Sequence, residues 1–259
     1  MPRRNLMKYY SHYKVNFIPK VEEFIEHKEL ISDFIGSLVN NGQIIQETVS
    51  SLLLSKTEAF CFCTLIEENA IAQTNDNLSV CEDKKNLAHY FDVIFEKIAE
   101  NIDYKGFICG CNNSSFILQG DYKESPVVCA DCEGAVPLYR LPKIRNSVEH
   151  ADVLWWYNDY NNINDLWISD HMNRFTYKQL NNPNSQLAKN GRKICAAYEK
   201  ATGKPFYYKL FYDDITRKKP VPNNCPLCGE NWVFECENKV IDFKCDKCRL
   251  VADKNNYNK

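Results

Sequence analysis

The chain has 259 residues, of which 44 % are hydrophobic and 13 % are aromatic, enough apolar material for one large domain or two modest ones. This composition excludes an intrinsically disordered chain, and the formal net charge of −2 argues against nucleic-acid binding through overall charge. No apolar run approaches the roughly 20 residues that cross a membrane, and the residues that follow Met1 are not the apolar core of an export signal. We expect a cytoplasmic protein that binds no membrane.

Residues 1–105 predict a small α/β unit that begins with a strand and a helix. Tyr13, Val15 and Phe17 alternate with polar neighbours, which is typical of a strand. From Pro19 to Leu38 apolar residues recur at steps of three and four, which predicts an amphipathic helix. The helix is expected to end at Asn40-Asn41-Gly42.

Two strands and a second helix are predicted to complete this unit. Strand-like runs cover 44–54 and 59–66, with a polar turn between them. Residues 75–85 have the composition of a loop, and apolar residues at helical spacing then predict an amphipathic helix. These residues are Leu87, Phe91, Ile94, Phe95 and Ile98. The resulting order, β-α-β-β-α, favours a ferredoxin-like sandwich as the first part of an α+β fold.

Residues 106–214 predict a central region of short strands, turns and a helix that carries one group of cysteines. Aromatic residues crowd 151–181, where they form either an exposed stacking surface or the packed seam between two halves of the molecule. We favour packing, because large rings dominate the energetics of protein cores. A helix is expected at 183–203 and a strand at 205–212.

The C-terminal residues predict a zinc ribbon that forms a separate module. Residues 215–224 are charged and contain prolines, as in a linker. Two C-x-x-C pairs follow, separated by sixteen residues. A single pair can be a redox dithiol or two unrelated core cysteines, but two pairs at this spacing favour a closed tetrahedral Zn²⁺ site, which is structural. The expected ligands, within the ribbon at 225–252, are Cys225, Cys228, Cys245 and Cys248.

A second and less regular group of cysteines lies in the central region. Thirteen cysteines in a chain without an export signal predict reduced thiols, and close cysteine pairs then usually hold metal. Here a C-x-C pair and a C-x-x-C pair are seventeen residues apart, and we expect a second structural Zn²⁺. The alternative is that these cysteines are small apolar side chains on neighbouring strands. The expected ligands are Cys109, Cys111, Cys129 and Cys132. Cys61 and Cys63 share strand parity, and core packing is favoured for them.

Several motifs occur together between residues 105 and 252. They are Cys109-x-Cys111, Ser125-Pro126-Val127-Val128-Cys129-x-x-Cys132, 136–142, Leu187-Ala188-Lys189-Asn190-Gly191-Arg192, 225–232 and Phe243-Lys244-Cys245-Asp246-Lys247-Cys248-Arg249-Leu250. The combination resembles a family of uncharacterised bacterial proteins described as zinc-ribbon-containing, with a suggested role in nucleic-acid binding. The resemblance implies two zinc sites and no reaction. The suggested role rests on analogy with other ribbons, which is an argument from fold.

The sequence offers no recognisable catalytic centre. There are five histidines, but no HExxH motif, no glycine-rich phosphate loop and no serine nucleophile elbow. Asp213 and Asp214 are interpreted as solvated turn residues. Only convergence of His150 and Asp152 with the Asp170-His171 pair would suggest an active site. We therefore expect a protein that is not an enzyme and has no small-molecule substrate.

Nucleic-acid binding through the ribbon is the alternative function. The candidate residues are Arg217, Lys218, Lys219, Lys244, Lys247 and Arg249, with Trp232, Phe234 and Phe243 available for stacking. Because a ribbon has little core of its own, we favour packing for Trp232 and Phe234. Eight thiolates add eight negative charges and two Zn²⁺ add four positive ones, so the formal charge falls from −2 to −6 when both sites are filled.

The acidic balance and the lack of a catalytic motif favour a protein partner. An acidic surface speeds the capture of a basic partner, and metal-stiffened hairpins present fixed loops. We predict a non-enzymatic interaction protein, such as a regulator or an immunity-type inhibitor of a toxic enzyme.

Overall fold

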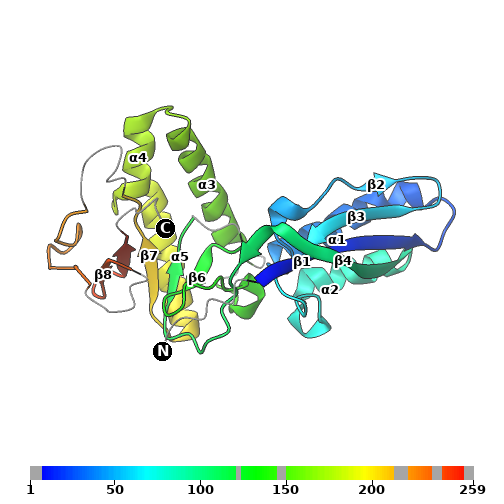
Figure 1. The fold of residues 1–259 in the computed structure, drawn as a ribbon, viewed down its shortest axis with the longest axis horizontal. Coiled ribbons are helices and arrows are strands. Elements are labelled where there is room, and N and C mark those ends of the chain that lie inside the picture. Colours follow the sequence, from blue (N-terminus) through cyan, green and yellow to red (C-terminus); the bar gives the residue numbers. More distant parts are fainter. Residues whose placement is uncertain (1–7, 121–123, 145–149, 213–220, 235–240, 254–259) are drawn as a thin grey trace.

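The computed structural model describes residues 8–120, 124–144, 150–212, 221–234 and 241–253. They form a mixed α+β structure of two units, each with its own sheet, that follow one another along the long axis of the molecule (Figure 1). Within these ranges no helix is long and apolar enough to span a bilayer.

The N-terminal unit is a four-stranded antiparallel sheet with two helices. The sheet has the order β2-β3-β1-β4, and Val15 of β1 lies opposite Cys61 of β3 and Phe95 of β4. The strands are β1 (Lys8–Pro19), β2 (Leu53–Leu54), β3 (Ala59–Thr64) and β4 (Phe91–Gly106). The helices are α1 (Lys28–Asn40) and α2 (Leu78–Ala88).

Alternation along the strands places the core of this unit on one face of the sheet. The buried side chains include Tyr13, Val15 and Phe17 of β1 and Ala59, Cys61 and Cys63 of β3. They pack with Ile31, Phe34 and Leu38 of α1 and Val80 and Leu87 of α2. The core role predicted for Cys61 and Cys63 is confirmed, and burial raises the pKa of Cys61 to about 11 and that of Cys63 to about 12. Both thiols therefore stay protonated at neutral pH.

The helix predicted through 87–98 is wrong beyond Ala88, because 91–98 form the first half of β4. The helix of this region is α2, which occupies 78–88 and so replaces most of the loop predicted at 75–85. The apolar residues of this segment satisfy both a helical and a strand period. In the structure Phe91 is buried against Phe17, whereas Ile94 is exposed on the opposite face. The side chain of Asn77 caps α2 by accepting a hydrogen bond from the Val80 N–H at 2.9 Å. The element order is therefore β-α-β-β-α-β.

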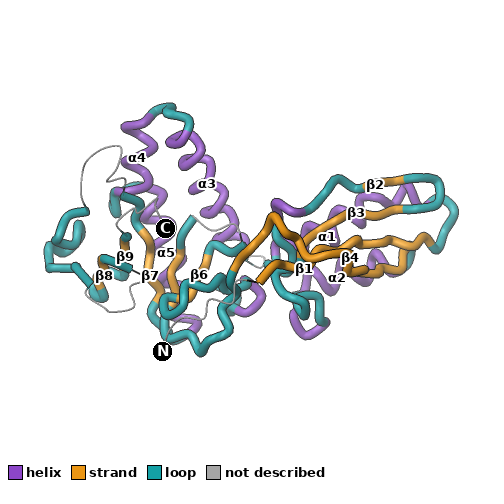
Figure 2. The backbone as a smooth tube through the Cα atoms, in the orientation of Figure 1, coloured by secondary structure: helices purple, strands orange, loops and turns teal. Residues whose placement is uncertain are grey.

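The C-terminal unit is a five-stranded sheet covered by helices (Figure 2). Its order is β6-β5-β7-β9-β8; the three central strands are parallel and both edge strands are antiparallel. The strands are β5 (Phe116–Leu118), β6 (Val127–Cys129), β7 (Phe206–Lys209), β8 (Phe243–Cys245) and β9 (Leu250–Ala252). The helices are α3 (Ala151–Ile168), α4 (Asn173–Asn181) and α5 (Gln186–Thr202).

Helix α5 forms where the sequence predicts a helix. Ser185 caps its start, and Gly203 ends it in the left-handed conformation, with φ of 69°. Gly191 is required by close packing, because a Cβ atom there would lie 2.2 Å from the ring of Tyr208. Tyr198 stacks on Phe206 of β7 with ring centroids 4.9 Å apart. The helix thus lies directly against the parallel centre of the sheet.

The segment predicted as a separate C-terminal module is part of this sheet. β9 pairs with β7 in parallel, so the hairpin of β8 and β9 extends the sheet of the C-terminal unit. Trp232 is buried, contacts Phe243 and Tyr212, and donates a hydrogen bond from Nε1 to the Pro222 carbonyl at 2.6 Å. The physical reason is that so short a hairpin gains its core by sharing that of a larger unit. Packing is confirmed as the role of Trp232.

The aromatic segment 151–181 is mostly core and partly exposed. Trp156, Tyr157, Tyr160 and Tyr177 are buried in α3 and α4, as predicted. Trp155 and Phe175 are exposed.

Candidate metal centres

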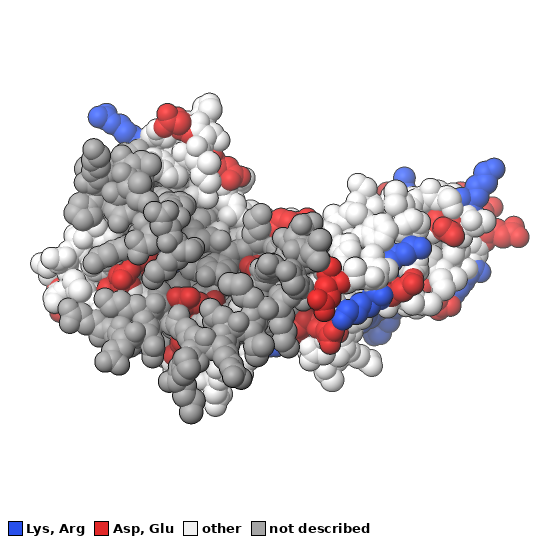
Figure 3. Space-filling model, in the orientation of Figure 1, with Lys and Arg blue, Asp and Glu red and all other residues white. Residues whose placement is uncertain are grey.

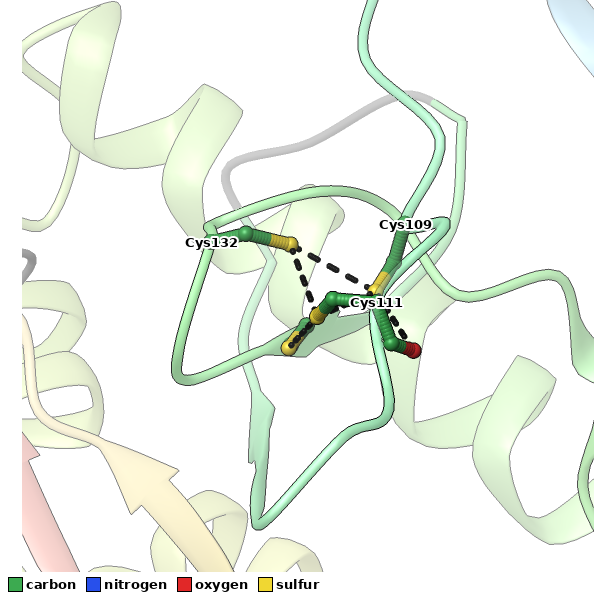
Figure 4. Close-up of side chains that lie close together, drawn as sticks. Cys109, Cys111 and Cys132 are labelled. Carbon is green, nitrogen blue, oxygen red and sulfur yellow. Dashed lines mark hydrogen bonds between the residues drawn. The ribbon is translucent and has the colours of Figure 1, made fainter. Parts of the chain in front are cut away.

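The first cluster joins the sulfurs of Cys109, Cys111, Cys129 and Cys132. Cys109 and Cys111 lie on the loop before β5, whereas Cys129 ends β6 and Cys132 follows in the next turn. The sulfur of Cys111 is 3.2 Å from that of Cys109 and 3.5 Å from that of Cys132 (Figure 4). It is 3.4 Å from the sulfur of Cys129. Four sulfurs around one Zn²⁺ stand about 3.8 Å apart, since each Zn–S bond is ~2.3 Å. The arrangement is compatible with one bound metal ion.

Backbone contacts hold the two halves of the first cluster together. The Cys109 N–H donates to the Ala135 carbonyl at 2.9 Å, and the Cys129 N–H donates to the Gly134 carbonyl at 2.9 Å. A Cβ atom at Gly134 would lie 2.7 Å from the Cys109 nitrogen, so only glycine allows this approach. At Gly110 a Cβ atom would meet nothing within 4 Å, so no steric contact requires a glycine there.

A polar bridge connects the first cluster to the N-terminal unit. Arg140 donates from Nη1 to the Cys109 carbonyl at 2.7 Å and forms an ion pair with Glu67, which follows β3. The hydroxyl of Tyr139 donates to the same carboxylate. Arg140 and Tyr139 belong to the Val136–Pro142 motif of the sequence, whose role as a bridge the sequence did not reveal. This cluster therefore lies at the junction of the two units.

The second cluster joins the sulfurs of Cys225, Cys228, Cys245 and Cys248. All four sulfurs lie within 4.8 Å of one another, and those of Cys228 and Cys245 are 3.6 Å apart. Cys245 ends β8, and Cys248 follows in the turn to β9. The Gly229 N–H donates to the Cys225 carbonyl at 2.9 Å, which closes the first turn. This cluster too is compatible with one metal ion.

All three C-x-x-C turns are followed by a residue in the left-handed conformation. Glu133 has φ of 62°, Gly229 of 76° and Arg249 of 52°. This conformation is uncommon for residues other than glycine and costs free energy. Gly229 adopts it without strain, whereas Glu133 and Arg249 are held in it despite their side chains.

The thiols alone are not stable as four anions. Hydrogen bonding from Cys109 lowers the pKa of Cys129 to about 5, and the same interaction raises the pKa of Cys109. In the second cluster a backbone N–H donor lowers the pKa of Cys228, whereas burial raises the pKa of Cys248. In each cluster, therefore, one thiol has a lowered pKa and another has a raised pKa. A bound divalent cation would allow four thiolates to coexist.

The predicted nucleic-acid-binding residues that the structure describes, Lys244, Lys247 and Arg249, are each paired with a carboxylate. Lys244 lies 3.1 Å from Asp246, Lys247 contacts Glu230, and Arg249 holds Glu199 of α5 with contacts of 2.8 to 3.1 Å. Hydrogen bonds from Arg249 lower the pKa of Glu199. Arg217, Lys218 and Lys219 lie outside the described residues. The three described cations thus have structural roles that sequence spacing did not reveal.

His150 and Asp152 lie at one end of α3 and do not meet the Asp170-His171 pair at the other end. His150 is buried just before α3, with its Nδ1 atom 3.0 Å from the Tyr198 hydroxyl. Asp170 and His171 follow the other end of the 18-residue helix, about 27 Å away at 1.5 Å per residue. Asp213 and Asp214 lie outside the described residues.

A largely apolar cavity lies between the two units. Its volume is about 420 Å³, and its walls come from α1, from residues 46–52 and from Leu154 and Asn158 of α3. No charged residue lines it. Sequence patterns do not predict this cavity, because its walls belong to distant segments.

These features define a two-unit α+β protein with two tetracysteine clusters. Residues 111–211 match the model of a domain of unknown function, DUF2310, and residues 217–255 match that of another, DUF8594. The first match includes Cys111, Cys129 and Cys132, and the second includes all four cysteines of the second cluster.

The chain is also similar to two proteins of Haemophilus influenzae, both described as uncharacterized. One is 24 % identical over 237 residues, which cover 86 % of this chain and 89 % of that protein. The other is 28 % identical over 134 residues, which cover 50 % of this chain and 64 % of that protein. No solved structure matches the chain.

Proposed function

We propose that each cluster binds one Zn²⁺ as a structural ion and that the second is a zinc ribbon built on β8 and β9. Convergence of four sulfurs in each cluster carries this proposal. A tetrahedral ion with four thiolate ligands has no position for water, so it supports the fold rather than a reaction. The N-terminal unit is proposed to be a ferredoxin-like sandwich, because its element order and its β2-β3-β1-β4 sheet are those of that class.

The protein is proposed to act without catalysis by binding a protein partner, as a regulator or an immunity-type inhibitor of a toxic enzyme. The observation that favours this is a patch where α3 turns into α4, called here the hairpin tip. It consists of Asp165, Leu166, Ile168, Asp170, Met172 and Phe175. The exposed fractions are 41 % for Leu166, 70 % for Ile168, 66 % for Met172 and 50 % for Phe175. Grouped apolar side chains that face water mark interaction surfaces.

Charge and backbone at the hairpin tip are consistent with this role. Asp165 and Asp170 are both exposed, and Arg174 is the only lysine or arginine in 165–175, so the patch suits a basic partner. Asp170 and Met172 have positive φ angles of 59° and 52°. Such backbone strain is found at functional sites more often than elsewhere. Figure 3 shows charged side chains of both signs beside uncharged surface at this end of the molecule.

Capture from native lysate tests the protein-binding proposal. The zinc-loaded chain should retain one stoichiometric protein after nuclease treatment, and the double variant I168D/M172D should lose it while keeping its zinc and its unfolding midpoint. L78D is the matched control, since Leu78 of α2 is 71 % exposed but lies in the other unit. Recovery of nucleic acid alone, or equal capture by I168D/M172D, would refute the proposal.

Nucleic-acid binding near the ribbon is the second candidate. A pocket of about 510 Å³ beside the second cluster is lined by four cations, Arg192, Lys200, Lys247 and Arg249, and by Glu199. Cations around a concave site attract phosphate. The variant R192Q/K200Q should lose binding to DNA or RNA, with a shallower dependence on salt. Unchanged binding would remove this pocket as the site.

A further inference from the structure

The second face of the N-terminal sheet presents a set of side chains that the proposed function does not use. Along β1 and β3 the buried residues alternate with His12, Lys14 and Asn16 and with Phe60 and Phe62, all of them half-buried. The core with α1 and α2 lies on the other face. These five side chains therefore occupy the outward face of the two central strands.

We propose that this face, called here the aromatic platform, binds single-stranded nucleic acid by stacking bases on its rings. Phe60 and Phe62 have ring centroids 5.7 Å apart, and His12 stacks on Phe62 with centroids 6.0 Å apart and planes inclined by 15°. Successive outward residues of a strand place rings at regular intervals. Aromatic rings on an open surface stack bases irrespective of sequence, because each base has a π-face.

Polar groups interleave with these rings at the centre of the platform. Lys14 lies opposite Phe62 in the register, with its ammonium 4.2 Å from the centre of the Phe60 ring. Asn16 lies opposite Phe60 and Ile94, and its amide donates to Glu96 at 3.3 Å. Donors beside rings can contact phosphates and base edges.

The arrangement of polar and apolar groups on the aromatic platform favours nucleic acid over a protein as its binding partner. Aliphatic side chains of the platform lie on the edge strands, with Leu53 of β2 opposite Phe60 and Ile94 of β4 opposite Asn16. A protein interface has the reverse order, an apolar centre with a polar rim. Two outward rings, two residues apart on the third strand of a β-α-β-β-α-β unit, are also how RNA-recognition modules stack bases. Glu58 and Ala59 stand where those modules have a basic residue and glycine.

Charge contributes little to nucleic-acid binding on this face, so the affinity should depend only weakly on salt. Lys14 is balanced by Glu96 across the strand pair, while Lys20 pairs with Asp92 and Lys97 with Glu68 nearby. Figure 3 shows both signs interspersed over the N-terminal unit. With about one phosphate contact, log affinity should change by only ~0.7 per log unit of salt. A shallow salt dependence thus separates the aromatic platform from the basic pocket of the C-terminal unit.

Fluorescence anisotropy with the zinc-loaded full chain tests the proposal. The probes are labelled oligouridine, oligothymidine and a duplex of equal length, and the two single strands distinguish RNA from DNA. Both F60L/F62L and F60Y/F62Y keep apolar bulk, but only the tyrosine pair keeps the rings. The leucine pair should weaken single-strand binding about a hundredfold, with roughly tenfold for each ring, while the tyrosine pair should bind as the wild type does.

Photo-crosslinking of the wild-type chain provides a readout that does not depend on how the variants fold. Oligonucleotides that contain iodouracil should crosslink within 59–64 of β3 or within β1. The proposal is overturned if the wild type binds neither single strand at about 100 µM protein, if F60L/F62L binds normally, or if crosslinks fall only within the C-terminal unit. Preference for the duplex would also contradict it.

Discussion

The two clusters have the same four-cysteine composition but different surroundings. The first lies between the units, where Arg140 connects the Cys109 carbonyl to Glu67 of the N-terminal unit. The second lies at the far edge of the C-terminal sheet, where Arg249 and the Tyr207–Asp246 hydrogen bond attach it to α5 and β7. We infer that the first metal stabilises the junction of the molecule and the second stabilises one edge.

Loss of the metal at the first cluster should lower the stability of the chain more than any other change considered. C132S removes one sulfur of a closed site, so the chain should retain one zinc instead of two, measured by elemental analysis. Structural zinc contributes on the order of 10 kcal/mol to small metal-dependent folds, and we expect several kcal/mol lower stability here. C81S is the control, since Cys81 belongs to neither cluster. Two zinc ions per chain in C132S would disprove the ligand assignment.

Loss of the second metal should be severe but more confined. C228S should also retain one zinc, and limited proteolysis should cut preferentially within 221–253. Urea unfolding monitored through the N-terminal unit should stay close to that of the wild type, because this cluster makes its attachments to α5 and β7. Equal damage to the N-terminal unit in C228S and C132S would remove the distinction between the two clusters.

Breaking the ion pair between Glu67 and Arg140 at the junction should lower the stability less than the loss of either metal. E67Q removes the charge that pairs with Arg140, whose side chain is 35 % exposed, so we expect about 1 kcal/mol after allowing for solvent screening. Thermal unfolding should separate into two transitions, one for each unit. E68Q is the matched control on the neighbouring residue, which pairs with Lys97 instead. A single unchanged transition in E67Q would show that the ion pair does not couple the unfolding of the two units.

The ion pair that attaches the second cluster to α5 should contribute least to stability, and its contribution should depend on pH. Arg249 lowers the pKa of Glu199, so the contribution of the pair is complete above the ordinary value of 4.5 and is lost as the pH falls through the lower folded value. Both side chains are about one third exposed, and we expect E199Q to cost about 0.5 kcal/mol near pH 7. The difference between wild type and E199Q, measured by urea unfolding, should vanish in acid. A constant difference would contradict this assignment.

The spacing of residues along the sequence predicted the two cysteine groups. Contacts between distant segments, which the sequence does not show, determined the structure of segment 91–98 and the position of the β8–β9 hairpin. Each C-x-x-C turn is a local structure, so its sequence indicates the convergence of two sulfurs directly. Segment 91–98 satisfied both helical and strand periods, and only pairing with β1 makes it a strand. The hairpin of β8 and β9 resembled an independent module, because its parallel pairing with β7 crosses more than forty residues and leaves no local signal.

The candidate interaction surfaces were less predictable than the clusters. Phe60 and Phe62 appear in the sequence as part of an apolar strand, and only the placement of α1 and α2 on the other face identifies them as outward rings. The basic residues near the second cluster suggested a phosphate-binding surface, but Arg249, Lys247 and Lys244 are held by carboxylates from three different segments.

The metal content of the reduced, tag-free protein tests the central claim most directly. Elemental analysis should find two zinc ions per wild-type chain and one in each of C132S and C228S. A wild-type chain that is folded and contains no metal would contradict the account, because eight sulfurs gathered in two groups would then need another explanation.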